Sequence, residues 1–330
     1  MFENIIGNDR IKKFLERYLT SDNHPHALLF VGNQGLGKGL LAREFARALL
    51  CEHLKGDDDC QSCRQFMAGV HPDFVKIGLL DDKKTLTIEQ MRELIAGSAF
   101  APVLGKNKVI LIEDVDLLRV EGANAILKIL EEPPASWTFI LLATHEERLL
   151  PTILSRVVTL RFAPLSYQEI EKSLLQQVDD KEHAPIYARL GDGSIGMALK
   201  LYEMDALELR KNALELLMQM PSAFPLNLAC QNLYALESKG KFERNEAITW
   251  LRLWQLLLRD AMLLKAGQKE IINQDLQFEL EKVAANASIA GLEGALEAVE
   301  VANGDLVGNI SVKQTFEQLI MVTNSYLERR

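Results

Sequence analysis

The segment Gly32–Gly39 (GNQGLGKG) contains four glycines and one lysine, and it directly follows the apolar run Ala27–Val31. Glycines let backbone N–H groups converge on phosphate oxygens, and a helix that begins here would add the positive end of its dipole. Spacing, lysine and strand-to-helix context agree, so we expect a P-loop rather than a flexible turn. The expected phosphate contacts come from one lysine and three glycines: Lys38, Gly32, Gly35 and Gly37.

Two positions of this predicted site depart from what ATP hydrolysis needs. A P-loop carries Ser or Thr after the lysine because that hydroxyl binds Mg²⁺, whereas this chain has Gly39. The apolar run Val109–Ile112 should end in Asp then Glu for metal binding and water activation, but it ends in Glu113 and Asp114. Solvated carboxylates at a strand end are the alternative interpretation. Both departures predict a nucleotide site with impaired hydrolysis, where ATP binding is weak or absent.

A second group of reactive side chains is the cysteine cluster Cys51, Cys60 and Cys63, which lies within 13 residues. In a cytosolic chain such a cluster indicates metal binding before it indicates disulfides. A cluster of reduced thiols in an acidic loop is the alternative, and we favour zinc.

The elements that must position these residues belong to a chain of 330 residues, 48% hydrophobic and 25% charged. At roughly 150 residues per domain, this length predicts two or three domains. The apolar runs are far shorter than the ~20 residues that cross a bilayer. The acidic start Met1–Asn4 has no basic region before an apolar stretch, so we expect no secretory signal and a cytoplasmic chain.

The net charge is −9, from 37 Lys and Arg against 46 Asp and Glu. A free-standing, non-specific nucleic-acid binder normally has a basic surplus, so this balance argues against that class. It leaves room for one local phosphate contact within a larger assembly.

Strand-like and helical patterns alternate in the first half of the chain. The expected strands are 27–31, 75–77, 109–112, 139–143 and 157–162, and the expected helices are 38–50, 88–98 and 124–132. Alternation of this kind predicts an α/β fold, with a parallel sheet and helices on both faces.

The pattern changes after Pro164, where Ser166 and Glu169 have the spacing of a capping box. From there on the chain has almost no strand signal, and apolar residues recur at helical spacing. We expect a P-loop module over residues 1–163 with an insertion at 51–63, a small helical domain over 164–205, and a larger helical domain over 206–330.

Several motifs together carry a family resemblance. They are 26–30 (HALLF), 71–73 (HPD), 124–134 (NAILKILEEPP), 154–157 (LSRV) and 193–199 (GSIGMAL). In these residues and in its cysteine cluster, the chain resembles the AAA+ clamp-loader subunits of bacterial DNA polymerase III, and among them the delta-prime members. The two glutamates of the 124–134 segment, Glu131 and Glu132, are expected to be solvated at a helix end, at or near a subunit contact.

The resemblance implies an AAA+ P-loop module, a helical lid and an all-α collar that holds the subunits in a ring. Delta-prime members act as a stator and present an arginine to the ATP site of the adjoining gamma/tau subunit. Here that arginine is Arg156, preceded by Ser155, and Val157 stands where the family motif has cysteine. An ordinary surface arginine is the alternative. Thr144 matches a polar sensor, and Gly196 stands where motor subunits carry a lid arginine.

The same resemblance implies the partners. They are the gamma/tau and delta subunits, with the sliding clamp and primed DNA reached through the complex, and no membrane. The chain is then no enzyme on its own, because the nucleotidyl transfer of a DNA-directed DNA polymerase resides in another subunit. The rival expectation is an active AAA+ motor of the gamma/tau kind. A P-loop kinase would need an acceptor-substrate site, which the sequence does not show.

The resemblance also implies a zinc site with four ligands. Counting back from the HPD motif identifies Cys63 and Cys60, and Cys51, at the end of the P-loop helix, matches the first ligand. Asp57 then stands at the remaining position, in a shortened loop. Zinc accepts carboxylate oxygen, and His53 is a second candidate for the fourth ligand.

Overall fold

The computed structural model describes residues 1–21, 24–56, 59–80, 85–97, 101–220, 244–308 and 310–327. The chain divides into two compact units. The first comprises Met1–Glu169 and Ser194–Gly196, and the second comprises Ile170–Gly193 and Met197–Arg330. The three-part division with boundaries after residues 163 and 205 stays a prediction.

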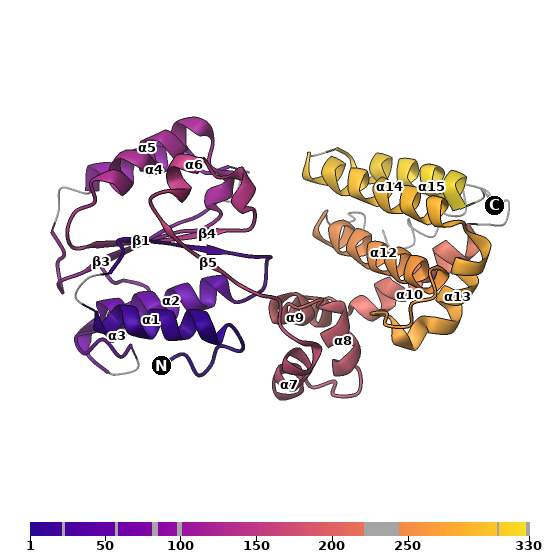
Figure 1. Cartoon of the computed structure of the whole chain (residues 1–330), viewed down its shortest axis with the longest axis horizontal. Coiled ribbons are helices and arrows are strands. Elements are labelled where there is room, and N and C mark those ends of the chain that lie inside the picture. The colour runs from indigo at the N-terminus through magenta and orange to yellow at the C-terminus, as the bar shows by residue number, and fades with distance from the viewer. Residues whose placement is uncertain are drawn as a thin grey trace. The chain divides into compact units, whose positions relative to one another are not determined.

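The first unit is built on a parallel sheet of five strands (Figure 1). The strands are β1 (Ala27–Val31), β2 (Phe74–Ile77), β3 (Lys108–Ile112), β4 (Trp137–Ala143) and β5 (Val158–Arg161). Their order in the sheet is β2-β3-β4-β1-β5. This arrangement confirms the α/β class, and all five predicted strands are present within two residues of their expected bounds.

Helices cover both faces of this sheet (Figure 1). One face carries α1 (Asp9–Thr20), α2 (Lys38–Leu50) and α3 (Gln61–Met67), and the other carries α4 (Ile88–Ala96), α5 (Val120–Glu131) and α6 (Pro151–Leu154). Alternate residues of β1 point to opposite layers: Leu28 and Phe30 pack under α1 and α2, whereas Leu29 packs under α5. Buried on both faces, β1 is apolar at every position, which explains its uninterrupted run.

Helix α5 begins at Val120, four residues before the expected start. Its N-cap, Arg119, makes no side-chain hydrogen bond to the helix. The start of α5 therefore lacks the Ser, Thr, Asp or Asn signal that marks a helix beginning in a sequence. Two short 3₁₀ turns, η2 (Val115–Leu117) and η3 (Glu146–Arg148), follow β3 and β4.

The described residues of the second unit form helices and no strand, as the apolar spacing predicts. They are α7 (Tyr167–Gln177), which begins in the first unit, α8 (Ala184–Leu190), α9 (Ile195–Glu203), α10 (Ala206–Gln219), α12 (Arg244–Lys265), η4 (Gln274–Leu276), α13 (Gln277–Asn286), α14 (Ile289–Val307) and α15 (Val312–Leu327). Trp250 and Trp254 lie at the centre of this core, with ring centroids 4.6 Å apart. The predicted capping box is present, because Ser166 Oγ accepts from the Glu169 N–H at 3.4 Å and Glu169 Oε2 accepts from the Ser166 N–H at 2.8 Å.

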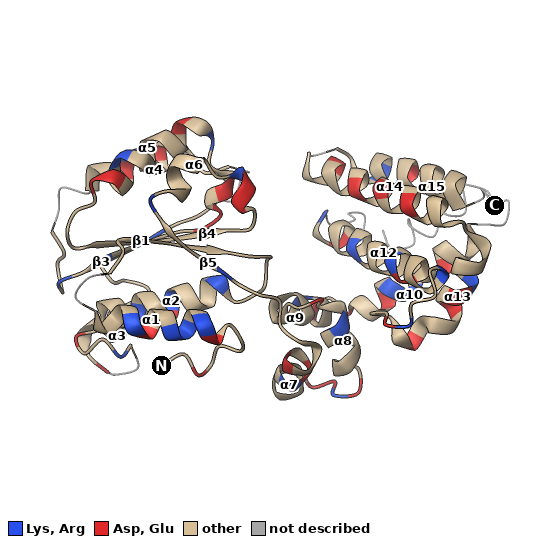
Figure 2. Cartoon of the chain, viewed as in Figure 1, with Lys and Arg blue, Asp and Glu red and all other residues tan. Residues whose placement is uncertain are grey.

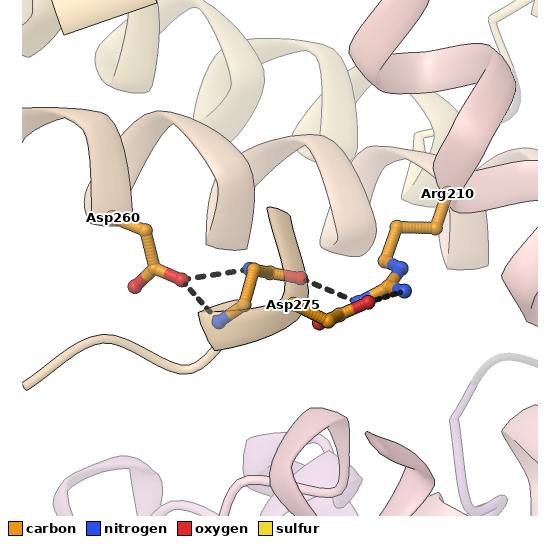
Figure 3. A network of polar contacts seen from close by, with 4 residues as sticks. Arg210, Asp260 and Asp275 are labelled. Carbon is orange, nitrogen blue, oxygen red and sulfur yellow. Dashed lines mark hydrogen bonds and ion pairs between the residues drawn. The ribbon is translucent and has the colours of Figure 1, made fainter. Parts of the chain in front are cut away.

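A buried polar network fastens α10 and α12 to the turn before α13 (Figure 3). Arg210 contacts both carboxylate oxygens of Asp275, at 3.0 and 2.5 Å. Asp260 accepts two hydrogen bonds at 2.7 Å from the backbone and side-chain amides of Asn273, and Asn273 Oδ1 accepts from Arg210. Burial of charge costs free energy unless it is paired, so this network fixes one arrangement of the three segments.

Charged residues are distributed unevenly along the chain (Figure 2). Basic side chains gather on α1, which carries Arg10, Lys12, Lys13 and Arg17 in a chain of net charge −9. Among the described helices, none is long and apolar enough to cross a membrane.

Candidate functional site

The predicted P-loop connects β1 to α2 at the carboxyl edge of the sheet, in the context that phosphate binding requires. Gly35 and Gly37 have φ angles of 76° and 84°, a left-handed region that glycine enters without strain. Gly37 also forms the N-cap of α2, so the first turn of the helix opens onto the loop. The expected strand–loop–helix arrangement is therefore present.

Lys38 turns back onto the loop that precedes it. Its Nζ donates to the carbonyl oxygen of Gly32 and, at 2.8 Å, to that of Asn33. Burial lowers the pKa of Lys38, and the carboxylates of Asp114 and Asp116 act in the opposite direction. The ammonium thus stays close to the cradle while two backbone carbonyls satisfy part of its hydrogen-bonding capacity.

The residues expected near a magnesium ion meet at the end of β3. A Cβ built on Gly39 would lie 3.9 Å from Glu113 Oε1, so Gly39 faces this carboxylate where a Ser or Thr hydroxyl would otherwise lie. Glu113 Oε2 forms an ion pair at 2.9 Å with Lys76 on neighbouring β2. The carboxylate is therefore balanced by a lysine, and the hydroxyl ligand has no counterpart.

Asp114 and Asp116 complete the acidic group at this edge. Burial, followed by the neighbouring carboxylates of Asp116 and Glu113, raises the pKa of Asp114. Asp116 accepts from the backbone N–H groups of Thr144 (3.3 Å) and His145 (3.0 Å). Sequence reasoning missed Asp116, whose only signal is a third acid two residues after Asp114. It holds the end of β4, and with it Thr144, against the turn after β3.

Gly196 packs directly on the P-loop, within the first unit. Its backbone N–H donates to the Gly35 carbonyl oxygen at 3.2 Å. A Cβ built on Gly196 would lie 2.9 Å from Gly35 Cα, which is closer than side chains approach backbone. The position that resemblance assigns to a lid arginine therefore has no space for a side chain in this structure.

Arg156 lies at the other edge of the sheet. It precedes β5 by two residues, and β5 runs parallel to β1, whose carboxyl end leads into the P-loop. The five residues of β1 span about 16 Å at ~3.3 Å per residue. Arg156 is therefore separated from its own P-loop by the length of a strand.

The guanidinium of Arg156 is held by three neighbours at this amino edge. Nη1 donates to the Thr152 carbonyl oxygen (2.8 Å) and to Ser155 Oγ (3.0 Å). Nη2 forms an ion pair with Glu131 Oε1 at 2.7 Å. Glu131 was expected to be solvated at a helix end, at or near a subunit contact, and its pairing with Arg156, 25 residues away in sequence, could not be predicted from local spacing.

The three predicted cysteine ligands converge. Cys51 follows α2, Cys60 caps α3 and Cys63 lies in its first turn, and their sulfur atoms lie within 4.8 Å of one another. Two sulfurs bound to one tetrahedral zinc at ~2.3 Å lie about 3.8 Å apart, so small side-chain movements suffice. Backbone N–H groups of His53 and Cys63 donate to the sulfurs of Cys51 and Cys60, as thiolate ligands require. The donor set fits zinc, and Asp57 lies outside the described residues.

A buried series of hydrogen bonds joins the segments that carry the cysteines. The Asp73 N–H donates to His71 Nδ1 (3.1 Å), which leaves Nε2 to donate to Ser62 Oγ (2.8 Å). Ser62 Oγ in turn donates to the Leu50 carbonyl oxygen at 2.6 Å. Burial lowers the pKa of His71, against the opposing charge of Asp73. The HPD motif thus joins α2, α3 and β2, a structural role that the sequence did not reveal.

Two family models match the chain. Residues 7–166 match "DNA polymerase III, delta subunit", and residues 205–321 match "DNA polymerase III, delta subunit, C terminal". The Escherichia coli DNA polymerase III subunit delta' is 32% identical over 290 residues, which cover 86% of this chain and 84% of that protein. The Pseudomonas aeruginosa delta' subunit is 37% identical over 138 residues, 41% of this chain and 42% of that protein.

Tau and gamma subunits match as well. The Bacillus subtilis DNA polymerase III subunit tau is 28% identical over 341 residues, which cover all of this chain but only 58% of tau. Among solved structures, a Thermotoga maritima protein related to the DNA polymerase III gamma subunit has a TM-score of 0.45 at 16% identity, covering 97% of this chain and 99% of that one. The similar proteins therefore include delta', tau and gamma subunits.

Proposed function

This chain belongs to the delta family of DNA polymerase III clamp-loader subunits, and we propose that it acts there as a stator, a subunit that does not itself drive the ring. Its neighbours are gamma/tau and delta subunits, and through the complex it helps to load the sliding clamp onto primed DNA in the cytoplasm. Its own contribution to the chemistry is Arg156, supplied to the ATP site of the adjoining gamma/tau subunit.

The observation that carries this proposal is the position of Arg156 at the edge of the sheet opposite its own P-loop. An arginine that is a strand length away from its own nucleotide site can act on a nucleotide only in a neighbouring molecule. Its side chain has an exposed fraction of 33%, so it is accessible to such a neighbour.

Arg156 would act on the transition state of phosphoryl transfer. Negative charge spreads over the γ-phosphate oxygens as the bond to the leaving group breaks. A guanidinium preorganised beside these oxygens stabilises that charge more than it stabilises the ground state, so it raises kcat. Nη1 is occupied by Thr152 and Ser155 and Nη2 is paired with Glu131, so phosphate would approach Nε and the remaining N–H of Nη2.

The carboxyl edge of the same sheet supports the other half of the proposal, a defective ATPase. Gly39 supplies no metal-binding hydroxyl, and Glu113 is paired with Lys76. When Mg²⁺ is bound, it neutralises charge between the β- and γ-phosphates; Glu113 is the residue here that could approach it. Lys38 and the loop glycines retain the means to hold a nucleotide passively.

We also propose that Cys51, Cys60 and Cys63 bind one structural zinc ion, with Asp57 or His53 as the fourth ligand. Zinc in a closed site of this kind supplies folding free energy and no catalysis. It would join the end of α2 to the start of α3 on the face of the sheet away from Arg156.

The test is Arg156→Ala in a reconstituted clamp loader, with assembly, ATP turnover and clamp loading measured separately. We expect an intact ring, reduced clamp loading and loss of the part of DNA-stimulated turnover that this interface supplies. Unchanged loading and turnover would make Arg156 a surface residue, and lost assembly would make it structural.

A parallel measurement separates the stator from the motor. We expect the isolated chain with ATP and Mg²⁺ to show no appreciable hydrolysis. Turnover at ~1 s⁻¹ or more that disappears with Lys38→Ala would establish a motor subunit instead.

A further inference from the structure

We propose that Glu131 is a positioning residue for Arg156, which it holds in the orientation needed at the neighbouring ATP site. This inference rests on the proposed role of Arg156. The two residues come from different elements, because Glu131 ends α5 and Arg156 follows α6. Their ion pair measures 2.7 Å, and both side chains are partly exposed, at 49% and 33%.

The position of Glu131 is unfavourable for its own helix. Carboxylates near a helix C-terminus face the negative end of the helix dipole, where lysine or arginine is preferred. Glu131 and Glu132 both lie at this end of α5, so the local rule is broken twice. A broken local rule suggests that the residue has another role. For Glu131 that role is the contact with Arg156, whereas Glu132 forms no ion pair among the described residues.

The backbone that carries Glu131 is held firmly. His26, just before β1, contacts the Leu130 carbonyl oxygen through Nε2 at 2.9 Å. After Glu132 the chain continues into Pro133 and Pro134, and the Pro134 carbonyl accepts from the Trp137 N–H at 2.9 Å. Proline fixes φ and disfavours helical backbone in the residue before it, which stops α5 at a defined point. The carboxylate therefore projects from a rigid part of the sheet edge.

The other contacts of the Arg156 side chain are with residues close to it in the sequence. Thr152 and Ser155 both lie within four residues of Arg156, so they move with it. Glu131 is the contact that relates the guanidinium to the core of the sheet. An arginine side chain has many rotamers, and restricting them before the neighbour arrives reduces the entropy lost at the active interface.

The experiment uses the reconstituted clamp loader with Glu131→Gln, Glu131→Asp, Glu132→Gln, Arg156→Ala and the double variant Glu131→Gln/Arg156→Ala. The measured quantity is the Arg156-dependent part of clamp- and DNA-stimulated ATP turnover, defined as the difference between the unsubstituted and the Arg156→Ala complexes. Ring assembly and the thermal midpoint of each variant are measured alongside.

We expect Glu131→Gln to lower kcat of that part by about 3- to 10-fold with little change in KM for ATP, because orientation rather than ATP binding is lost. Glu131→Asp keeps the charge but shortens the side chain, so its loss should be smaller. Glu132→Gln removes a charge one residue away and should have no effect. In the Arg156→Ala background, Glu131→Gln should cause no further loss.

Each other outcome overturns the inference. An equal loss from Glu131→Gln with and without Arg156 would assign Glu131 a separate role, and a gain in turnover would make the ion pair a restraint. Turnover that falls with Arg156→Ala but not with Glu131→Gln overturns only the positioning role. Turnover that is unchanged by Arg156→Ala overturns the proposed function itself.

Discussion

The two edges of the central sheet differ in how their charged residues are used. At the carboxyl edge, Glu113 is paired with Lys76 and Lys38 bonds to the carbonyls of its own loop, so these charges are largely satisfied internally. At the amino edge, Arg156 is held by Glu131 through Nη2, and its side chain remains 33% exposed. We propose that the edge with the conspicuous phosphate-binding motif is defective in hydrolysis, and that the edge without such a motif carries the catalytic contribution.

This contrast shows why a nucleotide-binding motif is weak evidence for turnover. A glycine-rich loop follows from backbone geometry and persists as long as the strand-to-helix turn is needed for the fold. Metal ligation and water activation depend on the side chains at single positions such as 39 and 113, which can change without disturbing that turn.

The largest expected effect is a loss of ATP hydrolysis when Arg156, at the amino edge, is replaced by lysine. Arg156→Lys should retain little of the activity that Arg156 provides, because an ammonium lacks the planar fork that grips two phosphate oxygens. An arginine finger contributes about 10³–10⁵ in rate at the site it serves, and we expect lysine to recover less than about a tenth of it. Single-turnover ATP hydrolysis in the reconstituted loader is the measurement, with Arg148→Lys as an arginine control outside this contact. Full activity with lysine would show that charge alone matters.

The next effect concerns the stability of the face beneath the P-loop helix. Protein purified without chelator should contain about one zinc per chain by elemental analysis, and Cys60→Ser or Cys63→Ser should remove it. We expect the unfolding free energy to fall by about 3 kcal/mol or more, since metal loss is among the largest single-substitution effects. Ring turnover per assembled complex should stay close to normal. Absence of zinc in the unsubstituted chain would contradict the proposed metal site. If zinc is present, comparing Asp57→Ala with His53→Ala identifies the fourth ligand.

A smaller effect would test whether a hydroxyl added at the carboxyl edge raises nucleotide affinity. A side chain at Gly39 meets only ordinary contacts with Leu142 and Glu113, so Gly39→Thr should fold normally. We expect Mg²⁺-dependent nucleotide affinity to rise by about tenfold or less, the scale of one added ligand contact. Hydrolysis by the isolated chain should stay negligible, because Glu113 and Asp114 remain in reversed order. Appreciable turnover by this variant would show that a single residue separates the edge from a working ATPase.

The smallest expected effect is a pH dependence of folding stability that arises from His71, shortly before β2. His71 has a folded-state pKa below its usual value, so between the two pKa values the unfolded chain binds more protons. Stability is therefore full above about pH 6.5, the unfolded value, and is lost as pH falls below it. Protonation would place a hydrogen on Nδ1, opposite the Asp73 N–H. Urea unfolding at several pH values checks this slope, which His71→Gln should reduce.

Much of the fold could be predicted because its signals are local. Strand β1 is buried at every position and appears as an unbroken apolar run, and the Ser166–Glu169 box appears within four residues. The start of α5 could not be found in this way, since Arg119 makes no capping bond. The second unit was predicted as helical from its apolar spacing, but the ion pair of buried Arg210 with Asp275 joins residues 65 positions apart.

The candidate sites also divide into those with local sequence signals and those that depend on distant residues. The P-loop and the cysteine cluster are local in sequence, and the structure brings each of them together. The contacts of Glu131, Asp116 and His71 depend on neighbouring strands and loops that only the folded chain places side by side. Sequence spacing carries no information on such partners without a set of related sequences.

The contact between Gly196 and Gly35 bears on how such a subunit can change over generations. A substitution of Gly196 by arginine would bring its Cβ against the Gly35 backbone, and Gly35 in turn relies on a left-handed conformation that few residues adopt. The loop must therefore move away before an arginine at this position can be tolerated. An arginine at position 196 thus requires earlier substitutions that open this contact, so the order in which substitutions occur matters.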